Sequence, residues 1–210
     1  MDRRILLLPL LAAAALAAGC GAAMKAAPPA TTTTSTSTSA ATSAAATTSG
    51  AGALQAEANS AAAGDIPDNQ VFLAFHDASA GFSIKYPEGW AQRGSRSSVT
   101  FRDKNNVIRA VVSSGASWAR SSVEADLRAL KGARVETGPQ PVTLAGRPAF
   151  KVVYRTVSAP NPVTGKRVTL TVDRYYLSKP GRHAVLDLGS PVGVDNVDAY
   201  RLISQSFRWS

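Results

Sequence analysis

The chain has 210 residues, of which 23 are Lys or Arg and 14 are Asp or Glu, so its net charge near neutral pH is +9. Its single cysteine, Cys20, excludes an intrachain disulfide and any thiol chemistry in the residues that follow it. Residues 1–64 are mostly Ala, Thr, Ser and Gly, whereas nearly all charged and aromatic residues lie from Asp65 onward. We therefore expect one folded domain of 146 residues (210 minus 64), long enough to fold without disulfides.

Residues 1–19 have the pattern of an export signal. Arg3 and Arg4 give a positive start, and the apolar stretch Ile5–Ala18 is shorter than the roughly 20 residues that a membrane-spanning helix needs. Small residues then lead into Cys20, which resembles the lipobox of bacterial lipoproteins, although the leucine stands four residues before the cysteine and not three. The alternative is an ordinary secretory signal. We expect cleavage before Cys20, fatty acyl chains such as palmitate on the new N-terminus, and a lipid-anchored location on the extracytoplasmic side of the cell membrane.

The segment 20–64 is the expected tether between the anchor and the domain. Pro28 and Pro29 interrupt any early helix, and Thr31–Ser39 is an unbroken Thr/Ser run. With no sustained apolar face, the segment cannot offset the entropy lost on ordering, so a disordered linker is predicted. The Thr and Ser residues fit either a plain spacer or O-glycosylation, and the plain spacer is favoured.

The domain, residues 65–210, contains several stretches that alternate between apolar and polar residues, as half-buried strands do. The expected strands are Phe82–Tyr86, Ser98–Arg102, Val107–Ser113, Phe150–Arg155, Arg167–Asp173 and Ala184–Leu188. The turns expected between them include Asp103–Asn106, Pro160–Gly165 and Lys179–Gly181. Strands joined by such short turns form a mainly antiparallel sheet. The segment Val71–Phe75 fits either another strand or the first turn of a helix.

Two amphipathic helices interrupt the strands. The first is expected to begin at Ser121 as N-cap, with Glu124 completing a capping box. Its apolar stripe is formed by Val123, Leu127 and Leu130. The second is expected from Asp195 as N-cap to about Ser206, with Val197, Tyr200 and Ile203 facing inward. An antiparallel sheet with helices packed on it is an α+β domain.

One stretch of the domain carries a family resemblance. The run Phe82-Ser83-Ile84-Lys85-Tyr86-Pro87-Glu88-Gly89-Trp90, followed by Val99-Thr100-Phe101-Arg102-Asp103, resembles the N-terminal signature of the PsbP-like superfamily, which includes bacterial lipoproteins of the LpqN type. The ending Ser206-Phe207-Arg208 is also similar. The resemblance implies an α/β/α sandwich that acts as an assembly or interaction module, and no metal or cofactor site can be carried over from it.

The residues give little support to catalysis. His76 is expected in a polar loop before Asp77, and His183 at the start of a strand beside Arg182. A metal site would need these two distant histidines together with carboxylates, and it is the disfavoured alternative. Gly115-Ala116-Ser117-Trp118-Ala119 lacks the second glycine of a nucleophile elbow, and Gly165-Lys166 lacks the preceding glycine of a phosphate-binding loop. We therefore predict no catalytic residue, no metal and no cofactor, and we do not expect an enzyme.

The basic residues are the remaining candidates for a site. Lys151 and Arg155 fall on one face of a predicted strand, and Arg167 is expected to neighbour them across a hairpin. A second group consists of Arg93, Arg96, Arg102 and Lys104. A solvated surface is the simpler interpretation, and attraction of an anionic envelope component is the functional one. Nucleic acid is not expected outside the membrane.

The sequence thus favours an extracytoplasmic lipoprotein whose domain is a non-catalytic binding or assembly module for a protein or another envelope component. A carrier of a small apolar or lipidic ligand, held between sheet and helix, is the alternative. A cell-envelope hydrolase is a weaker alternative. The sequence does not indicate the oligomeric state.

Overall fold

The computed structural model describes residues 63–210 of the chain. Its elements, in chain order, are β1 (Phe72–Asp77), β2 (Phe82–Pro87), β3 (Ala91–Ser95), β4 (Ser98–Asp103), β5 (Asn106–Ser114), α2 (Arg120–Ala129), β6 (Arg134–Leu144), β7 (Arg147–Val157), β8 (Thr169–Lys179), β9 (Arg182–Pro191), α3 (Val197–Gln205) and β10 (Arg208–Trp209). The strands form a seven-stranded sheet in the order β3-β4-β5-β9-β8-β7-β6 and a three-stranded sheet in the order β1-β2-β10. Every pair of neighbouring strands is antiparallel, so the predicted α+β class is confirmed.

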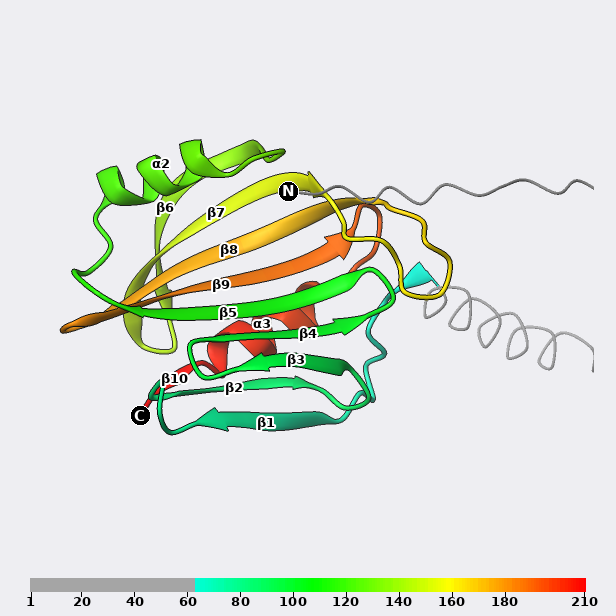
Figure 1. The fold of residues 1–210 in the computed structure, drawn as a ribbon, viewed down its shortest axis with the longest axis horizontal. Coiled ribbons are helices and arrows are strands. Elements are labelled where there is room, and N and C mark those ends of the chain that lie inside the picture. The colour runs from blue at the N-terminus through cyan, green and yellow to red at the C-terminus, as the bar shows by residue number, and fades with distance from the viewer. Residues whose placement is uncertain (1–62) are drawn as a thin grey trace, which may run out of the picture. The chain divides into compact units, whose positions relative to one another are not determined.

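The two helices pack on opposite faces of the large sheet. Figure 1 shows α2 along the β6–β7 end and α3 behind β5 and β4, while the near face of β9, β5 and β4 carries no helix. The face under α2 is covered by a small cluster of Val123, Leu127, Val152 and Tyr176. The main core lies on the other face, where α3 and the small sheet enclose the apolar side chains of β4, β5 and β9. This layering is the predicted α/β/α sandwich.

Aromatic rings connect the small sheet to the main core. Phe82 of β2 stacks on Phe207 with 5.7 Å between ring centroids, and Tyr86 stacks on Phe101 at 4.1 Å. Phe82 and Phe101 are fully buried, as the alternation in the sequence predicts. Aromatic pairs of this kind contribute more to stability than their buried area alone would give. The segment Phe82–Trp90, which carries the family resemblance, therefore has a role in packing the core.

Turn sequences account for most of the strand pairing. The β6–β7 hairpin closes through Ala145 and Gly146, both with positive φ, which is the backbone that a two-residue type I′ turn requires. The β8–β9 hairpin closes through Pro180 and Gly181, with φ at +74° on the glycine, as predicted. Such turns fix the register, and a slip of one residue would expose every core side chain.

Two strands that the sequence analysis did not predict lie at the edges of the large sheet. β6 contains Gly138, Pro139 and Pro141, and its pairing with β7 has register shifts on either side of Thr137. Proline and irregular register are tolerated at an edge because one side of the strand needs no partner. β3 is fully exposed and so shows no apolar alternation. The segment Val71–Phe75, for which the sequence left strand and helix open, is strand β1 from Phe72 onward. The loop predicted for His76 is wrong, because this residue lies within the same strand.

The helix boundaries differ from the predicted ones. α2 begins one residue before the expected cap, with Ala119 as N-cap, and the Ser122 hydroxyl oxygen accepts from the Ala119 amide at 3.0 Å. α3 has Asn196 as N-cap, while the Asp195 carboxylate accepts from the Val197 amide at 3.2 Å. The inward position predicted for Val197 is wrong, because the first turn of α3 extends past the core and leaves this side chain 72% exposed. Among the described residues, neither helix is long and apolar enough to span a membrane.

Candidate ligand groove and basic hollow

A groove of about 600 Å³ lies between α3 and the part of the sheet formed by β6, β7 and β8. Its apolar lining comes from Val142, Leu144, Leu188, Pro191, Val194 and Val197. Tyr175 on the sheet and Tyr200 on α3 add ring surface. The groove forms here because α3 covers β4, β5 and β9 and leaves the same face of β7 and β8 without a helix.

An ion pair lies in the floor of the groove. Lys151 Nζ on β7 and Asp173 Oδ2 on β8 are 2.7 Å apart, and their side chains are 30% and 27% exposed. The Lys151 ammonium also lies 5.4 Å from the centre of the Tyr175 ring, which gives it a cation–π contact. The groove therefore has apolar walls and, in its floor, one ion pair whose two charges nearly cancel. This arrangement suits a ligand with both apolar and hydrogen-bonding parts.

The ionisation of these groups follows from their neighbours. Burial alone would lower the pKa of Lys151, but the hydrogen bond and charge of Asp173 outweigh burial and raise it. Burial and the Asp173 carboxylate raise the pKa of the Tyr175 phenol. Burial also raises the pKa of Tyr200, whose hydroxyl donates to the Gly189 carbonyl at 2.7 Å. At neutral pH Lys151 is thus a cationic donor and both tyrosines are neutral.

The predicted basic site residues are only partly brought together. Lys151 and Arg155 lie on one face of β7, and each has a carboxylate partner: Arg155 Nε is 2.8 Å from Glu136 Oε1. Arg167 lies in the loop before β8, outside the predicted strand, and its guanidinium donates to the Ser158 carbonyl at 2.9 Å. Cys20 lies outside the described residues.

The two histidines lie in different places and have structural neighbours. His76 is on the edge strand β1, opposite Ser83. His183 begins β9, with Nδ1 3.0 Å from the Ala116 carbonyl oxygen and its ring 4.7 Å from that of Trp118. Within residues 63–210, no three His, Cys, Asp or Glu side chains come together as metal ligands would.

On the opposite face of the sheet, a buried charge network joins α2 to the strands. Arg174 Nε and Nη2 donate to the two oxygens of Asp187 at 2.6 and 3.0 Å, and Nη1 donates to Asp126 of α2 at 2.9 Å. The Arg174 and Asp187 side chains are only 5% and 7% exposed. The Tyr176 hydroxyl donates to the same Asp126 oxygen at 2.8 Å. Because its donors are satisfied, the buried guanidinium remains charged, and Asp187 holds its pKa above the ordinary value despite burial.

A smaller hollow of about 270 Å³ adjoins this network, between the C-terminal end of α2 and strands β4, β5 and β8. Three further basic side chains line it, namely Arg102, Arg109 and Lys131. Its apolar lining includes Val107, Leu130, Leu170 and Val172. Sequence reasoning missed Arg109, Lys131, Arg174 and Asp187. One signal in the sequence could have found this network. Arg174 falls on the same strand face as the apolar Val172 and Tyr176, and a buried arginine at such a position predicts a carboxylate partner.

No protein-family model matches the chain, and no curated protein sequence matches it. Solved structures with a similar fold include cyanobacterial PsbP from Synechocystis sp., at 15% identity, a TM-score of 0.49, and coverage of 70% of this chain and 98% of the other. LpqN of Mycobacterium tuberculosis, described as involved in cell envelope biogenesis, has 16% identity, a TM-score of 0.40 and coverage of 67% and 91%. The Ran-binding protein Mog1p of Saccharomyces cerevisiae has 11% identity, a TM-score of 0.43 and coverage of 67% and 96%. PsbP and LpqN are also the proteins after which the superfamily and the lipoprotein type of the sequence resemblance are named.

Proposed function

We propose that this chain is a lipoprotein modified at Cys20, whose domain works on the extracytoplasmic side of the membrane as a binding module. The observation that carries the proposal is the groove beside α3. Its volume of about 600 Å³ lies in the range of roughly 300–1,000 Å³ that is usual for ligand sites. Residues 1–19 then serve as the signal peptide and residues 20–64 as the tether that gives the domain its reach.

The composition of the groove favours recognition of a ligand that is partly apolar. Its walls bring apolar side chains and two tyrosine rings together with one ion pair, Lys151–Asp173. Because Asp173 already balances Lys151, a strongly charged ligand gains little there. A segment of a protein partner meets these requirements, since it supplies backbone hydrogen-bonding groups and apolar side chains along an open groove.

A small-ligand carrier is the second candidate, and the apolar wall formed by residues such as Val142, Leu144 and Leu188 favours it. A lipidic molecule would bury its chain against these residues and leave its polar end near Lys151. The two candidates use the same groove and differ in the mass of what occupies it.

Site-specific photo-crosslinking in the producing cell tests the proposal. A benzoylphenylalanine at Val197, on the groove wall and 72% exposed, is compared with one at Val163, a loop valine that is 91% exposed and does not line the groove. We expect an adduct at position 197 and none at position 163. An adduct with a second polypeptide supports the assembly module, and one of a few hundred daltons supports the carrier. Equal adducts at both positions, or none at position 197, would contradict the groove as the binding site.

A further inference from the structure

The basic hollow at the end of α2 lies on the face of the sheet opposite the groove and is independent of it. We propose that this hollow is a binding site for a phosphate group, held by Arg102, Arg109 and Lys131. The inference goes beyond the proposed function, because it requires neither the groove nor modification of Cys20.

The strand register brings the two arginines together. In the β4–β5 hairpin Arg102 is paired with Val107, and Thr100 with Arg109. Arg102 and Arg109 are therefore diagonal neighbours on one face, about 7–8 Å apart at the backbone and within reach of a shared ligand. Lys131 follows α2 and lines the same hollow from the other side. Three cations, from β4, β5 and the turn after α2, thus line one small space.

The carboxylates nearby leave this positive charge largely uncompensated. Both oxygens of Asp187 are engaged by Arg174, at 2.6 and 3.0 Å, and Asp126 also binds Arg174. Arg109 has only a 3.7 Å contact with Asp187, and its side chain is 47% exposed. With Arg174 included, four cations meet two carboxylates at this place, an excess of two positive charges. Within residues 63–210, this contact with Asp187 is the one ion pair of the Arg109 guanidinium.

The hollow combines this charge with the geometry that phosphate recognition uses. A guanidinium presents parallel N–H donors that match two oxygens of a phosphate, and an ammonium adds a point charge. The floor is apolar, with Leu170 and Val172 buried in it, so water is excluded from one side of a bound anion. Partial exclusion of water strengthens the attraction between the anion and the three cations. The volume of about 270 Å³ accommodates a phosphate with a small substituent, and any longer part of the ligand would lie outside the hollow.

Two sources supply this chemistry, a soluble phosphate and the headgroup of an anionic phospholipid. The test uses the full chain in dodecyl maltoside, an uncharged detergent, and follows nuclear magnetic resonance signals of Val107 and Ala133 in the hollow. One titration uses inorganic phosphate alone and another uses dihexanoyl phosphatidylglycerol, with dihexanoyl phosphatidylcholine as the comparison without net charge. Saturable shifts are expected with at least one of the two anions. Tighter binding of the lipid identifies the headgroup as the source, and equal or weaker binding identifies soluble phosphate.

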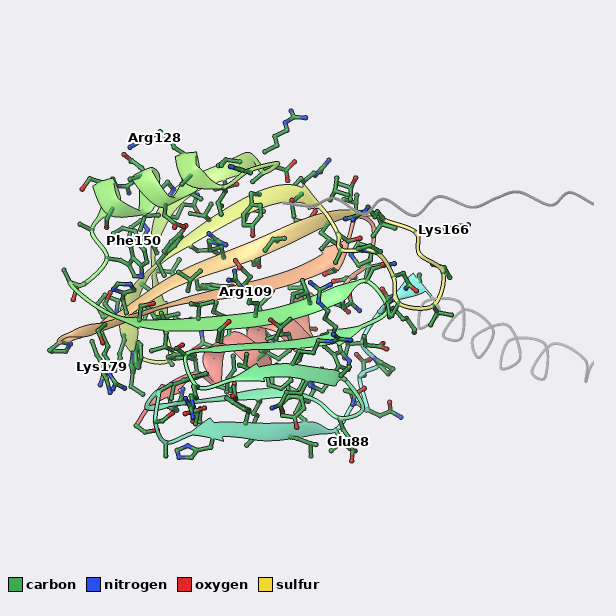
Figure 2. The ribbon with its side chains drawn as sticks, in the orientation of Figure 1. Glu88, Arg109, Arg128, Phe150, Lys166 and Lys179 are labelled. Atoms are coloured by element: carbon green, nitrogen blue, oxygen red, sulfur yellow. The ribbon has the colours of Figure 1, made fainter. Side chains whose placement is uncertain are left out.

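The matched variants are Arg102→Gln/Arg109→Gln in the hollow and Arg128→Gln/Lys166→Gln outside it. Figure 2 shows Arg128 on the outer side of α2 and Lys166 at the loop before β8, both away from Arg109. The first pair is expected to weaken binding at least tenfold, the effect of losing a hydrogen bond to a charged group. The second pair removes the same charge and is expected to change binding by no more than about twofold, because neither side chain lines the hollow and exposed charges are screened by salt.

Three results would overturn the inference: no saturable shift with either anion, equal weakening by both variant pairs, or, where phosphatidylglycerol binds more tightly than inorganic phosphate, equally tight binding of phosphatidylcholine. Thermal unfolding separates loss of binding from loss of structure. The hollow variant should unfold within a few degrees of the wild-type chain, since both arginine side chains lie at the surface of the sheet and exposed charges contribute little to stability. If it unfolds much earlier, Arg109→Gln alone serves as the test, because its single 3.7 Å ion pair is weak.

Discussion

Replacing Asp187 with alanine is expected to destabilise the domain strongly, because it leaves the buried Arg174 guanidinium without its main partner. Two hydrogen bonds, at 2.6 and 3.0 Å, are lost, and the Arg174 side chain is only 5% exposed, so water cannot replace them fully. Removing one partner of a buried pair costs about 3–5 kcal/mol. Arg174 keeps its bond to Asp126, which places the expected loss near the lower end of that range.

The magnitude can be measured by urea unfolding followed through tryptophan fluorescence, since Trp118 lies 4.9 Å from Tyr176 beside the network. For a domain of this size, the loss corresponds to a fall in Tm of roughly 6–20 °C. Asp126→Ala is the matched comparison. Its side chain is 33% exposed, so removing its bonds to Arg174 and Tyr176 should cost less, about 1–2 kcal/mol.

An apolar double variant, Arg174→Leu/Asp187→Leu, separates the cost of an unpaired charge from the worth of the pair. It should recover most of the stability lost in Asp187→Ala, because apolar residues can replace a buried ion pair at little cost. A loss below about 1 kcal/mol for Asp187→Ala, or a double variant less stable than that single variant, would refute the reasoning.

Three further predictions follow from single features. Burial and the Asp187 charge raise the pKa of Tyr154 to about 12, so the unfolded chain, whose tyrosines ionise near pH 10, loses protons first. The contribution of this phenol to the free energy of unfolding should therefore be fully present below pH 10 and decrease by about 1.4 kcal/mol per pH unit between pH 10 and pH 12. Urea unfolding at stepped pH measures this decrease, and a free energy of unfolding that does not change over this range would contradict the burial of Tyr154. Gly94→Ala should destabilise the domain more than Gly146→Ala. Both glycines have a positive φ, but an added Cβ would collide with the Ser98 carbonyl at Gly94 and would meet no atom at Gly146. Equal melting temperatures of the two variants would argue against this close approach. Mass spectrometry of the mature N-terminal peptide should find Cys20 acylated and first in the chain, and a free thiol there would disprove the anchor.

Much of the fold follows from local sequence. Period-two alternation predicts the central strands, such as those holding Phe101 and Val172, because one face of each packs on a core. Turn residues such as Pro180-Gly181 predict which strands pair. Edge strands escape this reasoning: β6 contains prolines and β3 is exposed, so neither shows alternation, and tertiary pairing alone defines them.

The candidate sites were less predictable than the fold. Lys151 was singled out by its charge, but its partner Asp173 and the groove around it depend on how far α3 extends over the sheet, which no local pattern records. Arg102 was noted within a basic group. Its relation to Arg109 depends on the register of a hairpin, and its relation to Lys131 depends on where α2 ends. The boundaries of the signal and the tether, and the anchor at Cys20, stay predictions.

The central claim, that the groove beside α3 is the binding site of this domain, is tested most directly by blocking it. Thr171 lies in the floor of the groove on β8, and Thr169, two residues earlier on the same face of the strand, lies outside the groove lining. The full chain is isolated from its own cell envelope as wild type, Thr171→Trp and Thr169→Trp, and the component that co-purifies is quantified by mass spectrometry. The proposal predicts that the component is retained by the wild type and by Thr169→Trp and is lost from Thr171→Trp. Equal retention by all three chains would contradict it.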